Sequence, residues 1–415
     1  MLSWNIKEMK ANAESTAGMQ VAWHRPFSLL FGGHMKYRQL GRTGLSVSEV
    51  GVGCEGFVGK SASEVRALVD AMEDLGINFM DFYSPDPALL ENFGYAIAGR
   101  RDKFVLQQHL CAVWKNGQYL RTRNVEETKR GFEERLRLVG TDHFEIGMIH
   151  YVDALSDWEV CRRDILPIAR KLKDEGKILH IGLSSHNPEV ALEAIKEEDL
   201  QVLLFSVNPC YDLQPAGEDV EQLWAESAYS HPLLNMDPER QRLYETCERQ
   251  GVGIDVMKAF GGGDLLHADV SPAKVSLSPY ECMAYALSRP GVASVMAGAR
   301  SVGELAEDGK YSDAPEDQKD FAGALASMPM IRWEGHCMYC GHCAPCPVGI
   351  SVADVTRYLN LARAQGSVPE TVAQHYSVLA HHGSECIGCG ACETRCPFHV
   401  PVRENMRLAA KTFGV

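Results

Sequence analysis

The chain lacks long apolar runs and an excess of basic side chains, and each absence excludes a class of protein. No uninterrupted apolar run reaches about 18 residues, so we expect no membrane span. The 41 Lys and Arg are outnumbered by 55 Asp and Glu, and the formal net charge is −14. Such a surface repels nucleic-acid phosphates, so we expect no nucleic-acid partner. An acidic surface instead suits docking to a basic redox partner protein.

A convincing export signal is also missing. Residues 1–34 hold a short apolar patch near Phe27–Phe31 but no clear small-residue cleavage site. We therefore expect a flexible N-terminal extension rather than a targeting peptide, with Met35 resembling a natural start. Six scattered cysteines are typical of a reducing cytoplasm, where we expect the protein to reside. They are Cys54, Cys111, Cys161, Cys210, Cys247 and Cys282.

The other eight cysteines form two blocks near the end of the chain. Within each block most gaps are two residues long, and a proline follows the last cysteine. The blocks are Cys337, Cys340, Cys343 and Cys346, then Cys386, Cys389, Cys392 and Cys396. This spacing predicts two 4Fe–4S clusters, and hence one-electron transfer. Zinc knuckles and a disulfide framework are the alternatives, but zinc sites usually close with two separated CxxC pairs, and disulfides suit short secreted chains.

The last cysteine of a block ligates the other block's cluster in two-cluster ferredoxins. We therefore expect Cys346 to join the second block's cluster and Cys396 to join the first. Exposed clusters are sensitive to oxygen, so we expect an anaerobic or low-oxygen setting.

Strand and helix signals alternate along most of the chain. Eight apolar segments have the length and flanks of buried strands, and amphipathic segments follow them. The predicted strands are Val47–Gly53, Ile77–Asp81, Phe104–His109, Phe144–His150, Ile178–Leu183, Val202–Asn208, Val252–Met257 and Val292–Met296. The predicted helices run from Ser61 or Ser63 to Gly76, over 87–99, from Asn124 to Val139, over 157–175, over 187–197, from Pro238 to Gly251 and over 278–289. Eight such units predict an α/β fold, a (β/α)8 TIM barrel, with a doubly wound open sheet as the alternative.

The pattern divides the chain into an extension, a barrel and a cluster domain. We place the barrel at residues 35–328 and a small α-helical ferredoxin-like domain at 329–415. The 39 residues between the cysteine blocks include a helical stretch, Val352–Ala364, and are too long for a compact β-type ferredoxin. The irregular insertion 212–236 follows the sixth strand, where a loop at the barrel mouth often covers substrate; surface padding is the alternative.

Several segments resemble bacterial aldo-keto reductases, and the tail resembles the subgroup of that family with a ferredoxin domain. Tail features are the two Cys-Pro pairs and Arg357-Tyr-Leu-Asn. The matching barrel segments are 35–48, Ile77–Asp81, Ile149-His150, Gly182–His186, Asn208–Tyr211, Met257–Gly263 and Ala297–Glu307. The resemblance implies hydride transfer from a nicotinamide to a carbonyl, with a tyrosine as the acid.

The resemblance also implies which residues act, and the chain departs from it at two catalytic positions. Asp81 and His150 match the family's aspartate and histidine. Asp86 stands where the family has its tyrosine, and the stretch 107–109 stands where it has its lysine. A carbonyl that accepts hydride still needs a proton donor. We therefore expect Tyr83, His109 or His150 to donate.

Cofactor positions follow from the resemblance in the same way. Ser184, Ser185 and Asn208 would bind the carboxamide of NAD(P)H, and Tyr211 would stack on its ring. Lys258 would reach the pyrophosphate, and Arg300 and Glu307 belong to the adenosine segment. No flavin motif stands out, so a flavin is left as an open alternative. A metal ion on Asp81, His109 and His150 is a further alternative.

Together these features predict an iron–sulfur oxidoreductase of aldo-keto reductase type that acts on a small carbonyl-type metabolite. Hydride transfer moves two electrons, whereas a cluster moves one, so two alternatives stay open. In one, the clusters feed single electrons to the substrate without hydride. In the other, the barrel is a scaffold and the chain is an electron-transfer subunit of a larger redox complex.

Overall fold

The computed structural model describes most of the 415-residue chain. The described residues are 34–214, 237–269, 271, 275–321, 337, 343–364, 368, 370–396 and 399–415. The predicted N-terminal extension, most of the insertion 212–236, the domain boundary at 328/329 and Cys340 lie outside these residues.

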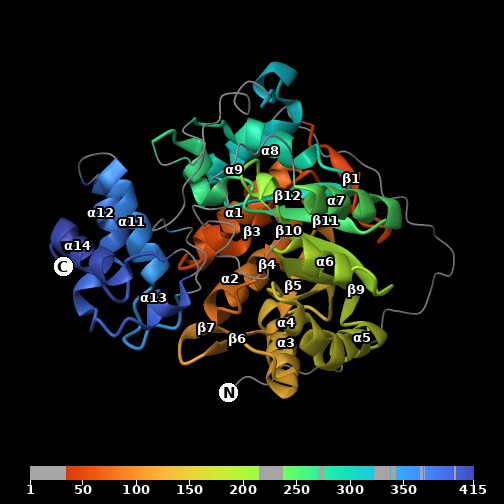
Figure 1. The fold of residues 1–415 in the computed structure, drawn as a ribbon, viewed down its shortest axis with the longest axis horizontal. Coiled ribbons are helices and arrows are strands. Elements are labelled where there is room, and N and C mark those ends of the chain that lie inside the picture. Colours follow the sequence, from red (N-terminus) through yellow and green to blue (C-terminus); the bar gives the residue numbers. More distant parts are fainter. Residues whose placement is uncertain are drawn as a thin grey trace.

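Eight parallel strands close into a barrel, as predicted (Figure 1). The barrel strands are β3 (Val50–Gly53), β4 (Phe79–Phe82), β5 (Val105–Leu110), β8 (Phe144–Ile149), β9 (Ile178–Ser185), β10 (Leu200–Ser206), β11 (Gly253–Met257) and β12 (Val292–Ala297). Each strand pairs with the next along the chain, and β12 pairs with β3 to close the ring. Strands such as β8 are buried along their whole length, because helices cover the outside and side chains fill the inside.

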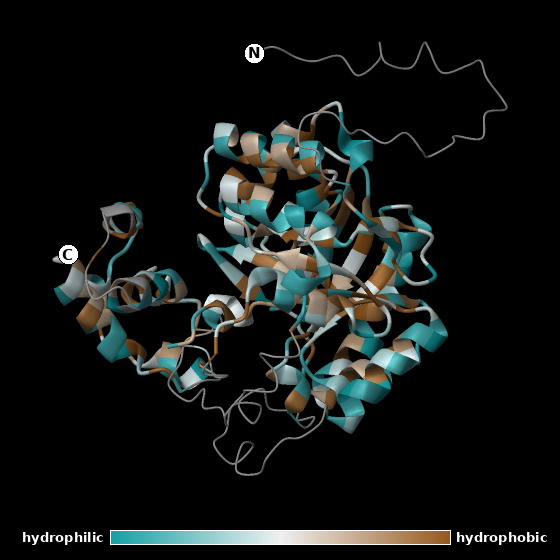
Figure 2. Ribbon diagram, turned by 90° about the horizontal axis from the view of Figure 1, so that it is seen from above, coloured by the Kyte–Doolittle hydropathy of each residue, from teal (hydrophilic) through white to brown (hydrophobic). Residues whose placement is uncertain are grey.

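Helices surround the barrel and begin and end where their capping residues predict. Ser61 and Glu64 form a capping box at the start of α1, and Gly76 ends that helix at a φ of 74°. The barrel helices are α1 (Ala62–Leu75), α2 (Pro87–Ile97), α3 (Val125–Val139), α4 (Leu155–Val160), α5 (Leu166–Asp174), α6 (Pro188–Ala194), α7 (Pro238–Gln250), α8 (Pro279–Leu287) and α9 (Val302–Gly309). Figure 2 shows apolar strands at the centre and hydrophilic residues on the surrounding helices.

Two details differ from the sequence prediction. The predicted strand Val47–Gly53 is two strands, because β2 (Ser46–Ser48) turns back to pair with β1 (Tyr37–Gln39) before β3 begins. The predicted helix 157–175 is interrupted by a π-helical turn at Cys161–Ile165, just before Pro167, whose ring disfavours a regular α-turn.

A second hairpin follows β5 and was not predicted. It consists of β6 (Ala112–Lys115) and β7 (Gln118–Arg121) in antiparallel register. Asn116 and Gly117 form its tip with φ angles of 54° and 73°, the left-handed conformation that a two-residue type I′ turn requires. The hairpin projects from the carboxyl end of β5, so it stands at the mouth of the barrel.

The cluster domain is helical and packs beside the barrel (Figure 1). Its helices are α11 (Val352–Ala364), α12 (Glu370–Ser377), α13 (Ala391–Arg395) and α14 (Val402–Phe413), so the helix expected between the cysteine blocks is confirmed. One apolar cluster joins residues of this domain, such as Val355 and Leu359, to Tyr211 and Leu265 of the barrel. Two polar contacts add to it: Gln118 Nε2 donates to the Cys346 carbonyl oxygen at 3.1 Å, and Arg357 lies 3.7 Å from Glu55. Within the described ranges, no helix is long and apolar enough to cross a membrane.

Candidate active site at the barrel mouth

A chain of hydrogen-bonding side chains links four elements at the carboxyl end of the strands. Asp81 lies on β4, His109 on β5, His150 directly after β8 and Tyr119 on β7. His109 Nε2 lies 2.8 Å from Asp81 Oδ1, and His109 Nδ1 lies 2.6 Å from His150 Nδ1. Tyr119 Oη lies 2.6 Å from His150 Nε2. The carboxyl ends of neighbouring parallel strands meet at one rim, which is why residues far apart in sequence come together here.

Counting the protons shows which atom donates and which accepts at each hydrogen bond between these side chains. Burial, followed by the nearby His109 and arginine charges, holds the pKa of His150 well below its usual range, so His150 is neutral. A neutral imidazole has one donor and one acceptor nitrogen. If His109 Nε2–H donates to Asp81, its Nδ1 accepts from His150 Nδ1–H, and His150 Nε2 then accepts the Tyr119 hydroxyl proton. Every contact in the chain then has one proton.

Basic side chains surround the Tyr119 end of the chain. Burial raises the pKa of Tyr119 to about 12, and the charges of Arg121, Arg123 and Arg135 oppose that rise. Arg123 pairs with Asp157 and also donates to the His150 carbonyl oxygen at 2.9 Å. Arg135 is fully buried, and its guanidinium donates to the carbonyl oxygens of His109 and Ala112. In this position Arg135 brings positive charge beneath the rim.

Tyr83, one of the three predicted donors, lies next to this hydrogen-bonded chain but outside it. Its ring stacks on His150 with centroids 6.4 Å apart and an interplanar angle of 9°, and it meets Tyr119 edge-on at 6.4 Å. Burial raises the pKa of Tyr83 well above its ordinary value, with Glu55 adding to the effect. Asp86, at the family's tyrosine position, caps α2 by accepting from the Ala88 amide. The structure thus brings Asp81, His109 and His150 together as predicted and places Tyr119, which we did not predict, at the end of the chain.

A second carboxyl group lies below Asp81 inside the barrel. Gln107 Nε2 donates to Asp81 Oδ1 at 2.8 Å and to Asp255 Oδ2 at 2.9 Å. Asp255, on β11, is completely buried. Burial raises the pKa of Asp255 well above its ordinary value, and the Asp81 charge raises it further. Asp255 is therefore a neutral acid, and Asp81 carries the negative charge of the pair.

The residues predicted to bind a nicotinamide ring are engaged within the barrel. Ser184 Oγ accepts from the Tyr151 amide, and Ser185 Oγ donates to Asp153 at 3.1 Å. Asn208 donates to the Lys258 carbonyl oxygen and accepts from the Tyr211 amide. Tyr211 is only 1% exposed, so neither face of its ring is open for stacking. These four side chains do not form an open nicotinamide site in this conformation, and their assignment stays a prediction.

The residues of the expected phosphate and adenosine segments lie on two further loops. Lys258 has a φ of 61° and is half-buried at the end of β11. Arg300 is exposed; burial of part of its side chain and the neighbouring Arg357 lower its pKa. Glu307 is held by Lys310 at 2.7 Å and by the Tyr280 hydroxyl at 3.0 Å. Because α11 brings Arg357 to Arg300, the cluster domain adjoins the segment expected to hold adenosine.

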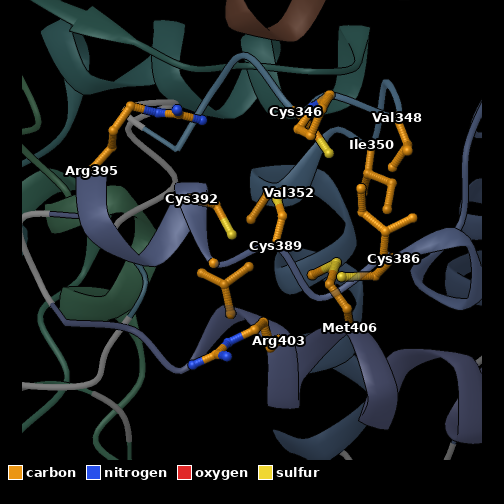
Figure 3. A pocket seen from close by; sticks show the side chains of 14 residues that line it. Cys346, Val348, Ile350, Val352, Cys386, Cys389, Cys392, Arg395, Arg403 and Met406 are labelled. Carbon is orange, nitrogen blue, oxygen red and sulfur yellow. The ribbon is translucent and has the colours of Figure 1, made fainter.

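Three of the four cysteines of the second block meet Cys346 in one pocket (Figure 3). Cys346, Cys386, Cys389 and Cys392 all line it, with Arg395 and Arg403 at its rim. Four thiols around one space fit the donor set of a 4Fe–4S cluster, and this arrangement is compatible with the ligand exchange between blocks, which stays a prediction.

The first-block cysteines contribute to the same apolar cluster of the domain. Cys337 and Cys343 pack against it, and Cys396 is buried in it. Arg395, next to Cys396, donates to the carbonyl oxygens of Cys343 and Pro345. These contacts agree with Cys396 joining the first block, whose remaining member, Cys340, lies outside the described residues. At the barrel mouth the imidazoles of His109 and His150 bond each other, and among the residues described there no group of three side chains is placed to hold a single metal ion.

Comparison with known proteins identifies the class. Residues 49–278 match the aldo/keto reductase family, and residues 335–400 match a 4Fe-4S dicluster domain. The chain therefore belongs to the aldo/keto reductase family. It is an oxidoreductase of aldo-keto reductase type with a C-terminal 4Fe–4S domain, as the resemblance implied.

Individual relatives match the barrel. The chain is 26% identical over 303 residues to the uncharacterized oxidoreductase YqkF of Bacillus subtilis, which covers 71% of this chain and 96% of that protein. A putative aldo-keto reductase from Pseudomonas aeruginosa is 25% identical, with a TM-score of 0.51, covering 66% of this chain and 93% of that one. The holo form of the aldo-keto reductase AKR11C1 from Bacillus halodurans shares the fold, with a TM-score of 0.55 at 21% identity over 73% of this chain and 99% of that one.

Proposed function

We propose that this chain reduces a small carbonyl-type or conjugated metabolite at the barrel mouth in single-electron steps, with Tyr119 as the proton donor. The hydrogen-bonded chain Tyr119–His150–His109–Asp81 is the observation that supports this function most directly. When bound, the two clusters would supply electrons one at a time, replenished by a one-electron donor protein. Reduction of a carbonyl to an alcohol also takes two protons, and the residues of the mouth deliver them.

Proton delivery follows from the geometry of the chain. With one extra proton, His109 is an imidazolium beside the Asp81 carboxylate, and His150 Nε2–H donates to the Tyr119 oxygen. Tyr119 then directs its own proton to the substrate oxygen. As that proton leaves, His150 Nε2–H passes its proton to Tyr119, and His109 Nδ1–H passes its proton to His150 Nδ1. The four hydrogen-bonded side chains are then back in their neutral arrangement. They take up one proton from solvent before the second proton transfer.

This assignment accounts for the two positions at which the chain departs from its family. Tyr119 on the β6–β7 hairpin supplies the hydroxyl that is missing at Asp86. The charges of Arg121, Arg123 and Arg135 favour the tyrosinate form, which is the role that the family gives to lysine. Because Tyr211 is covered and Ser184, Ser185 and Asn208 are already bonded, no step uses a nicotinamide.

Replacement of Tyr119 by phenylalanine tests the proposal, with Tyr83→Phe as the matched control. Protein prepared without oxygen is supplied with reduced methyl viologen and a panel of α-dicarbonyls, quinones and α,β-unsaturated ketones. General acids contribute about 10²–10⁴-fold to rate, so we expect Tyr119→Phe to lose about that much kcat with its iron content unchanged. We expect Tyr83→Phe to keep most of its activity, since its hydroxyl has no hydrogen bond to His150. Equal losses in both variants, or none in Tyr119→Phe, would reject Tyr119 as the acid.

Exposure of the second cysteine block favours a second candidate function, an electron-transfer subunit. Cys389 is exposed, and Ile387 beside it is 65% exposed, so another protein can reach this cluster directly. Under this alternative, no compound in the panel is turned over, yet the reduced chain passes electrons to a partner protein. The Tyr119→Phe substitution then has no effect on that transfer.

A further inference from the structure

The β6–β7 hairpin touches both the cluster domain and the proton-donor chain. Gln118 and Tyr119 are neighbours on β7, and successive side chains of a strand point to opposite faces. On one face Gln118 Nε2 donates to the carbonyl oxygen of Cys346 at 3.1 Å. On the other face the Tyr119 hydroxyl lies 2.6 Å from His150 Nε2. One peptide unit thus separates a residue bound to the cluster loop from the residue that ends the proton chain.

On the side of the cluster domain, the hydrogen bond is made to the backbone of a predicted cluster ligand, Cys346. Cys346 lines the same pocket as Cys386, Cys389 and Cys392, so its carbonyl belongs to the loop that presents one thiol of this site. The hairpin contact is also not isolated, because Arg357 of α11 lies 3.7 Å from Glu55 in the loop after β3. The two contacts hold the cluster domain to the mouth through different barrel loops.

We propose that Gln118 is a positioning residue that fixes the Cys346 loop to the proton donor, so that electrons enter the barrel mouth along the β6–β7 hairpin. A cluster held by Cys346 and the second-block cysteines would supply single electrons to the substrate beside Tyr119, and Tyr119 supplies the accompanying proton. The one-electron donor protein restores the reduced state. This inference rests on the proposed function for the electron's destination, but the link between Gln118 and the Cys346 site is testable without any substrate.

The hydrogen bond has a predictable effect on the cluster. An N–H donor directed at the ligand peptide places partial positive charge near the site, which favours the more negative, reduced state. Loss of the donor therefore makes reduction harder. From the net strength of a single hydrogen bond we expect a change of about threefold in the ratio of reduced to oxidised cluster at a fixed potential. In a one-electron couple this equals a lowering of about 30 mV.

The experiment compares Gln118→Leu and Gln118→Glu with Gln241→Leu. Gln241 is exposed on α7 and its side chain donates to Glu245, so it controls for the loss of a surface amide. Anaerobic redox titration followed by electron paramagnetic resonance gives the potential of each cluster, and amide hydrogen exchange reports on residues 112–121. We expect the reduction potential of one cluster to be highest in the wild type, lower in Gln118→Leu and lowest in Gln118→Glu. The potential of the other cluster should not change. Hydrogen exchange of the hairpin amides should be faster in both variants.

Unchanged potentials and unchanged exchange in both Gln118 variants would overturn the inference. Should the Leu variant load less iron, the Glu variant, which keeps the size and polarity of the side chain, decides the question alone. Failure of the proposed function is seen separately. If Tyr119→Phe keeps full activity while the Gln118 variants still shift one potential, the hairpin link stands and Tyr119 is not the acid.

Discussion

The buried carboxyl pair beneath the mouth gives a quantitative prediction for stability. Asp81 Oδ1 and Asp255 Oδ2 accept hydrogen bonds from the same nitrogen of Gln107, at 2.8 and 2.9 Å, so these oxygens are neighbours. Two unit charges about 5–6 Å apart at an effective dielectric constant of about 20 repel by about 3 kcal/mol. Added to the cost of burial, this repulsion keeps the Asp255 proton in place in the folded chain.

The substitution that tests this is Asp255→Asn. It replaces the ionisable carboxyl group by an amide that does not titrate but whose oxygen can still accept from Gln107. The pKa of Asp255 is raised in the folded state. Below the pKa of this carboxyl in the unfolded chain, about 4, the group is protonated in both states and does not change the free energy of unfolding. Above that value the unfolded chain loses a proton that the folded chain keeps. The free energy of unfolding contributed by Asp255 then falls by about 1.4 kcal/mol per pH unit until the folded carboxyl itself ionises. The Asn variant has no such dependence, so its stability relative to wild type rises with pH.

Urea unfolding followed by circular dichroism at several pH values between 5 and 8 measures this difference. Infrared spectroscopy supplies an independent check, because the absorption of a protonated carboxyl group should be present at neutral pH in the wild type and reduced in Asp255→Asn. Asp164→Asn is the matched control: Arg163 lowers the pKa of that carboxylate below its ordinary value of about 4, so its stability relative to the wild type should stay flat between pH 5 and 8. A stability difference for Asp255→Asn that stays flat or falls with pH would refute the assignment of Asp255 as a neutral acid.

Two other predictions concern the cofactors. Cys389→Ala should remove one cluster and lower the iron content from about eight to about four per chain; an unchanged content would refute the ligand set. Titration with NADH or NADPH should leave nicotinamide fluorescence and the cluster absorbance unchanged, because the Tyr211 ring is covered. Saturable binding, or bleaching of the cluster band, would return hydride transfer to consideration.

The barrel was predictable because its signals are local. Runs such as Phe144–Ile149 are apolar apart from Glu145, and Gly76 and Asn124 mark helix ends by well-understood backbone chemistry. The π-helical turn at Cys161–Ile165 was not predictable in the same way, since the apolar face continues through it. Periodicity reports which face is buried and says little about the local hydrogen-bond pattern.

The site was predictable in part. Asp81, His109 and His150 follow from their places at strand ends, whereas Tyr119 depends on a hairpin that brings it back over the mouth. Its signal was present in the Asn116-Gly117 turn, the strongest short hairpin pattern. Nothing local to Gln118 or Asp255 could reveal their roles. Their partners lie 228 and 148 residues away along the chain, and only the closed barrel and the docked helical domain bring them together.

The exchange of cysteines that we expect between the two blocks has a consequence for how the C-terminal region assembles. A cluster bound by Cys346 and the second block would join both ends of the 39-residue spacer and close α11 and α12 into a loop. With this ligand set, neither block would complete its cluster while the other is absent. Truncation ahead of Cys386, or loss of iron to a chelator, should therefore release the whole region at once, and maturation of the two cages should be an all-or-none event.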